Sequence, residues 1–147
     1  MEWIAVEDRQ INREVQKDIR GVNVTVAFSP YDVPRRFRGY RDPITNLFII
    51  DFEYLLDETT RPEKSSPDSP IELEIGENSK RIYRIKIDVA KLGCDAVRLE
   101  FEPLARNVIG EIQKFKSVVP EKLRERYKLA ESLLFNRRNE IFSPLAA

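Results

Sequence analysis

The 147-residue sequence contains no histidine, and Cys94 is its only cysteine. Histidine is the usual general base near neutral pH and the commonest metal ligand in proteins, so its absence removes several kinds of site at once. Catalytic triads that use histidine, zinc sites built from cysteine and histidine, and haem held by histidine are excluded. Any remaining chemistry would depend on carboxylate, lysine, tyrosine or arginine side chains.

Glycine is also scarce, and the five glycines are spread from Gly21 to Gly110. The dinucleotide-binding fingerprint and the P-loop both need closely spaced glycines, so nucleotide binding through either motif is excluded. A single cysteine cannot form an internal disulfide, and Cys94 has no histidine to activate its thiol. We interpret Cys94 as an ordinary turn or core residue, and we expect no cofactor and no metal.

Long hydrophobic runs are missing as well, since the longest, residues 47–50, is far shorter than the roughly 20 residues that span a bilayer. The first residues lack the basic and apolar pattern of an export signal, so we expect a cytoplasmic protein without a membrane partner. The 25 basic and 25 acidic residues leave no net charge. Binding to nucleic acid would therefore need a local basic patch.

The residues that are present indicate one α+β domain spanning residues 1–147. Hydrophobic residues make up 41% of the sequence, and its length is that of an ordinary single domain. We expect an N-terminal helix, an antiparallel sheet of about six strands, and a C-terminal helical hairpin packed on one face of the sheet.

The N-terminal helix is expected over residues 9–20. The apolar residues Ile11, Val15 and Ile19 are spaced four apart, as on one stripe of a helix, and Gly21 follows as a helix-ending residue. Two further helices are expected after the strands, because proline is favoured in the first turn of a helix. They begin near Pro103 and near Pro120 and carry apolar residues at helical spacing.

Period-two alternation of apolar and polar residues predicts the strands. These segments are residues 22–28, 35–41, 47–56, 71–75, 81–89 and 96–101. Short connections join the last three, so they should be consecutive antiparallel neighbours in a meander.

Residues 57–70 contain three prolines and no aliphatic or aromatic residue, which predicts a flexible loop. The loop carries two Ser-Pro pairs, Ser66-Pro67 and Ser69-Pro70. Turn chemistry explains them, and a regulatory phosphorylation is the less favoured alternative.

Residues 35–41 form the one uneven charge patch, with four arginines and two aromatic residues among seven positions. Arginine contacts phosphate and aromatic rings stack on bases, so Arg36, Arg38, Tyr40 and Arg41 are candidate contacts for an anion or nucleic acid.

A competing explanation comes from the partner arm of the predicted hairpin. There, Asp51 and Glu53 would share a face with Arg36 and Arg38, and cross-strand ion pairs would form. We favour this explanation, because exposed ion pairs of this kind are common.

Acidic residues two positions apart could serve an active site as a pair of carboxylates, with a metal or with separated pKa values. The pairs are Asp51 with Glu53, Glu72 with Glu74, and Glu100 with Glu102. Their regular alternation with apolar residues indicates the polar outer face of a sheet instead.

Four apolar residues lie beyond the expected core pattern and are candidates for an interface: Leu47 and Ile49 in the second arm of the first hairpin, and Ile141 and Phe142 in the C-terminal tail. The sequence therefore predicts a non-catalytic binding or self-association module, either a homodimer or bound to another protein. A nucleic-acid-binding module that uses residues 35–41 is the alternative, and a carboxylate-based metal-dependent enzyme is the second alternative.

Overall fold

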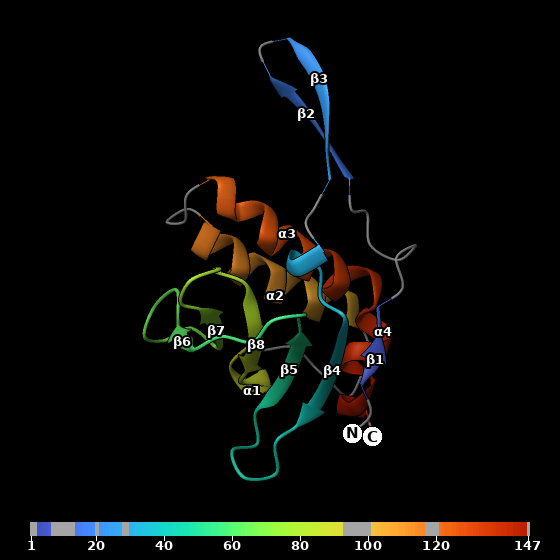
Figure 1. Ribbon diagram of the computed structural model, residues 1–147. Coiled ribbons are helices and arrows are strands. Elements are labelled where there is room, and N and C mark those ends of the chain that lie inside the picture. Colours follow the sequence, from blue (N-terminus) through green and yellow to red (C-terminus); the bar gives the residue numbers. More distant parts are fainter. Residues whose placement is uncertain are drawn as a thin grey trace.

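A computed structural model describes residues 3–6, 14–19, 21–27, 30–92, 101–116 and 121–146 of the chain. Within these residues the strands come first and the longer helices last (Figure 1). The strands are β1 (Ile4–Ala5), β2 (Glu14–Ile19), β3 (Val22–Ala27), β4 (Arg36–Arg41), β5 (Phe48–Glu53), β6 (Thr60–Glu63), β7 (Ile71–Gly76) and β8 (Ile82–Ile87). The helices are the 3-10 turn η2 (Pro30–Asp32), α1 (Val89–Leu92), α2 (Phe101–Lys116), α3 (Glu121–Asn136), α4 (Arg138–Phe142) and the 3-10 turn η4 (Ser143–Ala146).

Six of the strands form one antiparallel sheet in the order β1-β4-β5-β8-β7-β6. The pairs β4–β5 and β7–β8 are the two hairpins that the alternating sequence predicts. β8 also pairs with β5, so it lies between β5 and β7. β2 and β3 form a separate hairpin, which projects away from the sheet and the helices in Figure 1. The predicted α+β architecture with an antiparallel sheet is confirmed in outline.

One face of the large sheet and the helices α2, α3 and α4 enclose the hydrophobic core (Figure 1). The sheet contributes buried residues at alternate strand positions, among them Phe37, Phe48, Ile50, Phe52, Ile71, Leu73, Ile85 and Ile87. The helices contribute Val108, Ile112, Leu133 and Phe142, among others. Because side chains alternate along a strand, the opposite face of the sheet carries the polar residues.

The expected N-terminal helix over residues 9–20 is wrong, because residues 14–19 form strand β2; the first residues of that segment lie outside the described part of the chain. β2 pairs with β3 along its full length. Gly21 has a φ of 81° and lies in the turn between the two strands instead of ending a helix. Val15 and Ile19 fit a helical stripe and a strand face equally well, and pairing with the adjacent β-branched segment favours the strand.

The segment at residues 57–70, expected to be a loop, contains the edge strand β6. Three of the four β6 residues are exposed, and backbone pairing with β7 holds the strand in place. Pro62 is compatible with this position, because an edge strand leaves one side of its backbone unpaired. Further along, Ser65 and Ser69 both donate hydrogen bonds to Glu111 of α2. The flexibility of the segment stays a prediction.

The third strand of the expected meander cannot be followed in full. Residues 96–100 lie outside the described part of the chain, and Phe101 begins α2. The helices expected near Pro103 and Pro120 are present as α2 and α3, which pack against each other. None of the described helices combines the length and the apolar character that a membrane span requires.

The C-terminal segment closes over β4. Ile141 and Phe142 are fully buried, and the Phe142 ring lies 5.7 Å from that of Phe48, centroid to centroid. Gly39 permits this close approach: a Cβ atom at this position would overlap the carbonyl oxygen of Ile141 and lie 2.9 Å from Cζ of Phe48. The C-terminal tail is therefore part of the core.

Candidate functional site

Charged side chains cover the sheet face opposite the helices, which we call the charged face. Its residues are Arg36, Arg38 and Tyr40 of β4, Ile49, Asp51 and Glu53 of β5, Arg84 and Lys86 of β8, and Glu72 and Glu74 of β7. Basic and acidic strands alternate across this face. The register places unlike charges opposite each other, which stabilises neighbouring strands.

Asp51 is the centre of the charged face. Its side chain is only 6% exposed and accepts hydrogen bonds from Nε of Arg38 at 2.9 Å and from Nε of Arg84 at 2.6 Å. Partial burial lowers the pKa of Arg84, but the hydrogen bond and the charge of Asp51 outweigh this effect and raise that pKa. Burial and the nearby Asp51 carboxylate raise the pKa of Tyr40. Two guanidinium groups thus share one carboxylate, and this group of three carries a net positive charge.

The other charged residues of the face are paired in the same way. Arg36 donates a hydrogen bond to Glu53 at 2.7 Å, and this bond lowers the pKa of the Glu53 carboxyl. Lys86 lies 3.2 Å from Glu74 and 3.6 Å from Glu72. These side chains are partly exposed, so each pair contributes only modestly to stability.

Trp3 covers one end of the charged face. The next residue, Ile4, pairs with Phe37 of the core face, so alternation places Trp3 on the side of Arg36 and Arg38. The guanidinium carbon of Arg38 lies 4.2 Å from the centroid of the indole ring and that of Arg36 lies 4.8 Å from it, within the range of a cation–π interaction. Sequence reasoning missed Trp3, because the two-residue strand β1 is too short to show a pattern.

A shallow depression of about 280 Å³ opens beside Trp3. The β5–β8 pairing ends at Asp51 and Arg84, whereas β5 continues to Glu53 alongside β4. The last residues of this pairing, Asp51 and Arg84, line the depression. Its lining residues are Trp3, Arg38, Asp51, Phe52, Glu53, Asp57, Glu74, Tyr83 and Arg84.

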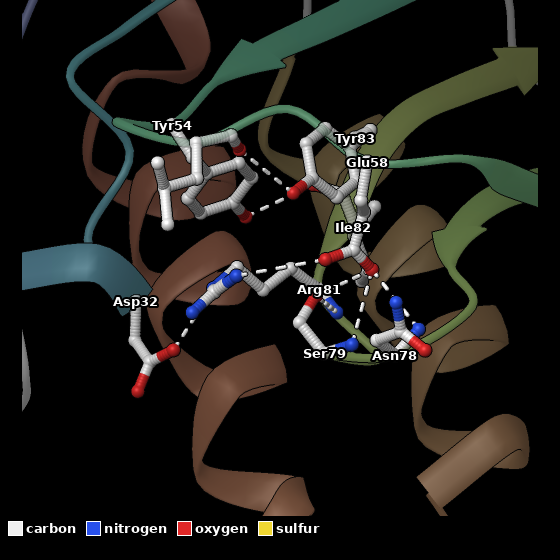
Figure 2. Close-up of polar contacts among 9 residues, drawn as sticks. Asp32, Tyr54, Glu58, Asn78, Ser79, Arg81, Ile82 and Tyr83 are labelled. Atoms are coloured by element: carbon white, nitrogen blue, oxygen red, sulfur yellow. Dashed lines mark hydrogen bonds and ion pairs between the residues drawn. The ribbon is translucent and has the colours of Figure 1, made fainter.

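A second polar cluster surrounds Glu58 and Arg81 (Figure 2). Glu58 accepts hydrogen bonds from the backbone amides of Asn78 and Ser79 and from the Ser79 hydroxyl. Arg81 donates a hydrogen bond to Asp32 at 2.9 Å. These contacts join the segment after β5 and the η2 turn to the β7–β8 turn, so we interpret the cluster as structural.

Three of the four candidate anion contacts, Arg36, Arg38 and Tyr40, lie together on the charged face. Arg41 does not take part in the face, since its Nη1 donates a hydrogen bond to the side chain of Asn46 at the hairpin turn. Cross-strand ion pairs account for Arg36 and Arg38, as the alternation of the sequence predicts.

The candidate interface residues are largely covered within this chain. Leu47 is half-buried, Ile49 is 5% exposed, and Ile141 and Phe142 belong to the core. These side chains therefore present little apolar surface to a partner. Cys94 lies outside the described part of the chain.

Among the described residues, no group of three or more acidic or cysteine side chains is placed to hold a metal ion. The acidic pairs of β5 and β7 face basic residues on the charged face. In the third pair, Glu102 forms an ion pair with Arg106 in α2, and Glu100 lies outside the described part of the chain.

Comparisons of the chain with protein-family models, with curated proteins and with solved structures found no match. The function must therefore be argued from the chemistry of the site itself.

Proposed function

We propose that this chain is a non-catalytic binding module and that its charged face receives a segment of another protein. The depression beside Trp3 carries the proposal, because a half-buried indole ring, two arginines and several carboxylates meet there on an open surface. Tryptophan, tyrosine and arginine are enriched where proteins bind one another, and they supply much of the binding energy.

The state of the carboxylates favours binding over catalysis. Catalytic carboxylates are usually desolvated, with pKa values raised towards neutral pH. The hydrogen bond from Arg36 instead lowers the pKa of Glu53. A carboxylate that stays ionised is suited to electrostatic recognition, and the carboxylate-based enzyme has no comparable observation in its favour.

Nucleic acid is the alternative partner for this surface. A phosphate contact to Arg36 would have to compete with Glu53, which already accepts a hydrogen bond from this arginine. The chain also carries no net positive charge to attract a polyanion. Both facts favour a protein partner.

An immobilised array of short random peptides tests the proposal. We expect the wild-type protein to bind a subset of peptides and the Trp3→Ala variant to lose most of that binding. Ile44→Ala is the matched control, because Ile44 is 91% exposed at the β4–β5 turn and an apolar side chain is shortened there too. An array without bound peptides, or binding that Trp3→Ala leaves intact, would contradict the proposal. Salt-sensitive binding to single-stranded DNA that is lost in Trp3→Ala would favour the nucleic-acid alternative.

A second candidate, self-association, is favoured by the β2–β3 hairpin, which projects from the rest of the described chain (Figure 1). The backbone register sets Val15 opposite Val26, Lys17 opposite Val24 and Ile19 opposite Val22, and in the sequence of β3 valine alternates with Asn23 and Thr25. A two-stranded hairpin alone is only marginally stable in water, so such a hairpin gains from a partner. We propose a second copy of the chain, because the zero net charge does not oppose association and twofold dimers are the commonest oligomers.

Light-scattering mass over a range of protein concentrations tests self-association. We expect a dimer for the wild type and for Thr25→Asp, which changes a polar position of the same strand. Val24→Asp should give a folded monomer. A wild type that stays monomeric at the highest concentration would exclude this candidate.

A further inference from the structure

Arg38 and Arg84 each contact Asp51 in a way that leaves the N–H donors on their Nη nitrogens available to a ligand. Each guanidinium contacts Asp51 through Nε. Among the described residues, the Nη nitrogens of these two arginines form no hydrogen bond. A guanidinium has five N–H donors, four of which are on the Nη nitrogens. Two residues that line the depression therefore have N–H donors without a hydrogen bond to the described residues.

We infer that Arg38 and Arg84 together bind the side-chain carboxylate of an aspartate or glutamate in the partner segment. The inference rests on the proposed function, in which the charged face receives a segment of another protein. Asp51 occupies only the Nε donors of the two arginines, so their Nη donors are left for the oxygens of a second carboxylate. Arginine is suited to this role, because its planar donors match the two oxygens of a carboxylate.

The anchoring of the two arginines supports the inference. The Asp51 side chain is 6% exposed, whereas those of Arg38 and Arg84 are 28% and 35% exposed. The guanidinium groups are thus fixed from beneath by a buried acceptor and remain open to solvent. The indole ring of Trp3 further restricts Arg38, since it lies 4.2 Å from the guanidinium carbon. Groups held in place before binding lose less conformational entropy when a ligand arrives.

The other carboxylates of the depression limit the ligand and supply a test. Arg36 lies 2.7 Å from Glu53 and pairs with it, whereas Lys86 is shared between Glu74 at 3.2 Å and Glu72 at 3.6 Å. Glu74 lies opposite Arg84 in the strand register, so its charge also opposes an incoming anion. Asp57 is exposed, and its charge opposes an incoming anion. Removal of the Asp57 charge should therefore strengthen the binding of an acidic ligand and weaken that of a basic one.

Trp3 provides a direct readout, because it is the only tryptophan of the chain and contacts Arg38. The probe is a blocked tetrapeptide with two central glutamates, and its glutamine and lysine counterparts are the controls. We expect a saturable change of tryptophan fluorescence with the glutamate peptide only.

Four variants sharpen this titration. Arg84→Gln should weaken binding of the glutamate peptide about tenfold, because it removes one charged donor group. Arg84→Lys keeps the charge without the planar donors and should give an intermediate loss. Arg41→Gln is the matched control outside the depression and should bind like the wild type. Asp57→Asn should tighten binding severalfold. Melting temperatures establish that each variant is folded.

Three outcomes would overturn the inference: no saturable change with the glutamate peptide, a preference for the lysine peptide, or weaker binding in Asp57→Asn. If array binding still depends on Trp3 while the glutamate peptide fails, only the carboxylate inference falls. If neither the array nor the peptide shows binding that depends on Trp3, the proposed function falls as well.

Discussion

Replacing Gly39 with alanine should show how tightly the C-terminal segment packs on the sheet. The added Cβ atom would overlap the carbonyl oxygen of Ile141 and approach Cζ of Phe48 to 2.9 Å. The first of these is a backbone atom, which cannot rotate away like the end of a flexible side chain. The overlap can be relieved only if α4 moves away from β4.

The expected change in the free energy of unfolding follows from two opposing effects. In an open strand position, alanine would be more stable than glycine by about 0.5–1 kcal/mol, because glycine loses more conformational entropy on folding. Overpacking of a filled core costs about 1–3 kcal/mol and sometimes more. Since Gly39 faces backbone, we take the upper overpacking cost of about 3 kcal/mol and expect a net loss of about 2–2.5 kcal/mol. Complete release of Ile141 and Phe142 would cost roughly 3–6 kcal/mol, which sets the upper limit.

Urea unfolding of matched variants measures this effect. Gly110→Ala is the control, because a Cβ atom at this position of α2 meets nothing within 4 Å. Alanine is favoured over glycine in a helix, so Gly110→Ala should stabilise the protein by about 1 kcal/mol. The two variants should therefore shift the unfolding midpoint in opposite directions. A Gly39→Ala protein as stable as the wild type would refute the close packing of α4 on β4.

Three further substitutions test buried polar groups in the same assay. Within the described part of the chain the buried Tyr127 hydroxyl has no hydrogen-bond partner, and burial raises its pKa to about 12. Tyr127→Phe should therefore leave the free energy of unfolding unchanged or raise it by up to about 1 kcal/mol. The Tyr54 hydroxyl donates a hydrogen bond to the Ile82 carbonyl at 2.9 Å, so Tyr54→Phe should lower the free energy of unfolding by about 1–2 kcal/mol. Equal effects of Tyr127→Phe and Tyr54→Phe would contradict this difference between the two hydroxyls. Burial raises the pKa of Glu58, but hydrogen bonds from Ser79 outweigh it and lower that pKa below the ordinary 4.5. The destabilisation caused by Glu58→Gln should therefore be largest at pH values above 4.5 and should disappear as the pH falls through the pKa of Glu58 in the folded protein. A destabilisation that does not change with pH would exclude a stabilising role for the ionised Glu58 carboxylate.

The two hairpins of the large sheet could be predicted from the sequence, because one of their faces is buried and the other is polar. The strand register follows from the same pattern, so the pairing of Arg36 with Glu53 and of Arg38 with Asp51 could also be predicted. Helices α2 and α3 could be predicted for a similar reason, since the sequence of each has a wide apolar stripe.

The features that escaped prediction depend on contacts that leave no local pattern. Val15 and Ile19 satisfy the spacing of both a helix and a strand, and only the partner strand β3 distinguishes the two. β6 is held by backbone hydrogen bonds to β7, and its mostly exposed side chains give no apolar pattern that would predict a strand. Trp3 joins the candidate site through a two-residue strand whose partner is more than 30 positions away.

The charges of the sheet also determine which strands can be neighbours. On the charged face the charged side chains of β5 are both acidic, and those of β7 are as well: Asp51 and Glu53 on β5, Glu72 and Glu74 on β7. A sheet in which β7 lay directly beside β5 would set like charges opposite each other, which is unfavourable. The core faces of β7 and β8 are both aliphatic, so hydrophobic burial alone does not choose between them. On the charged face β8 carries the basic residues Arg84 and Lys86. This opposite sign of charge favours the position of β8 between the two acidic strands β5 and β7. Exchanging the charges of β7 and β8 would remove the electrostatic preference for the observed strand order while leaving the hydrophobic core unchanged.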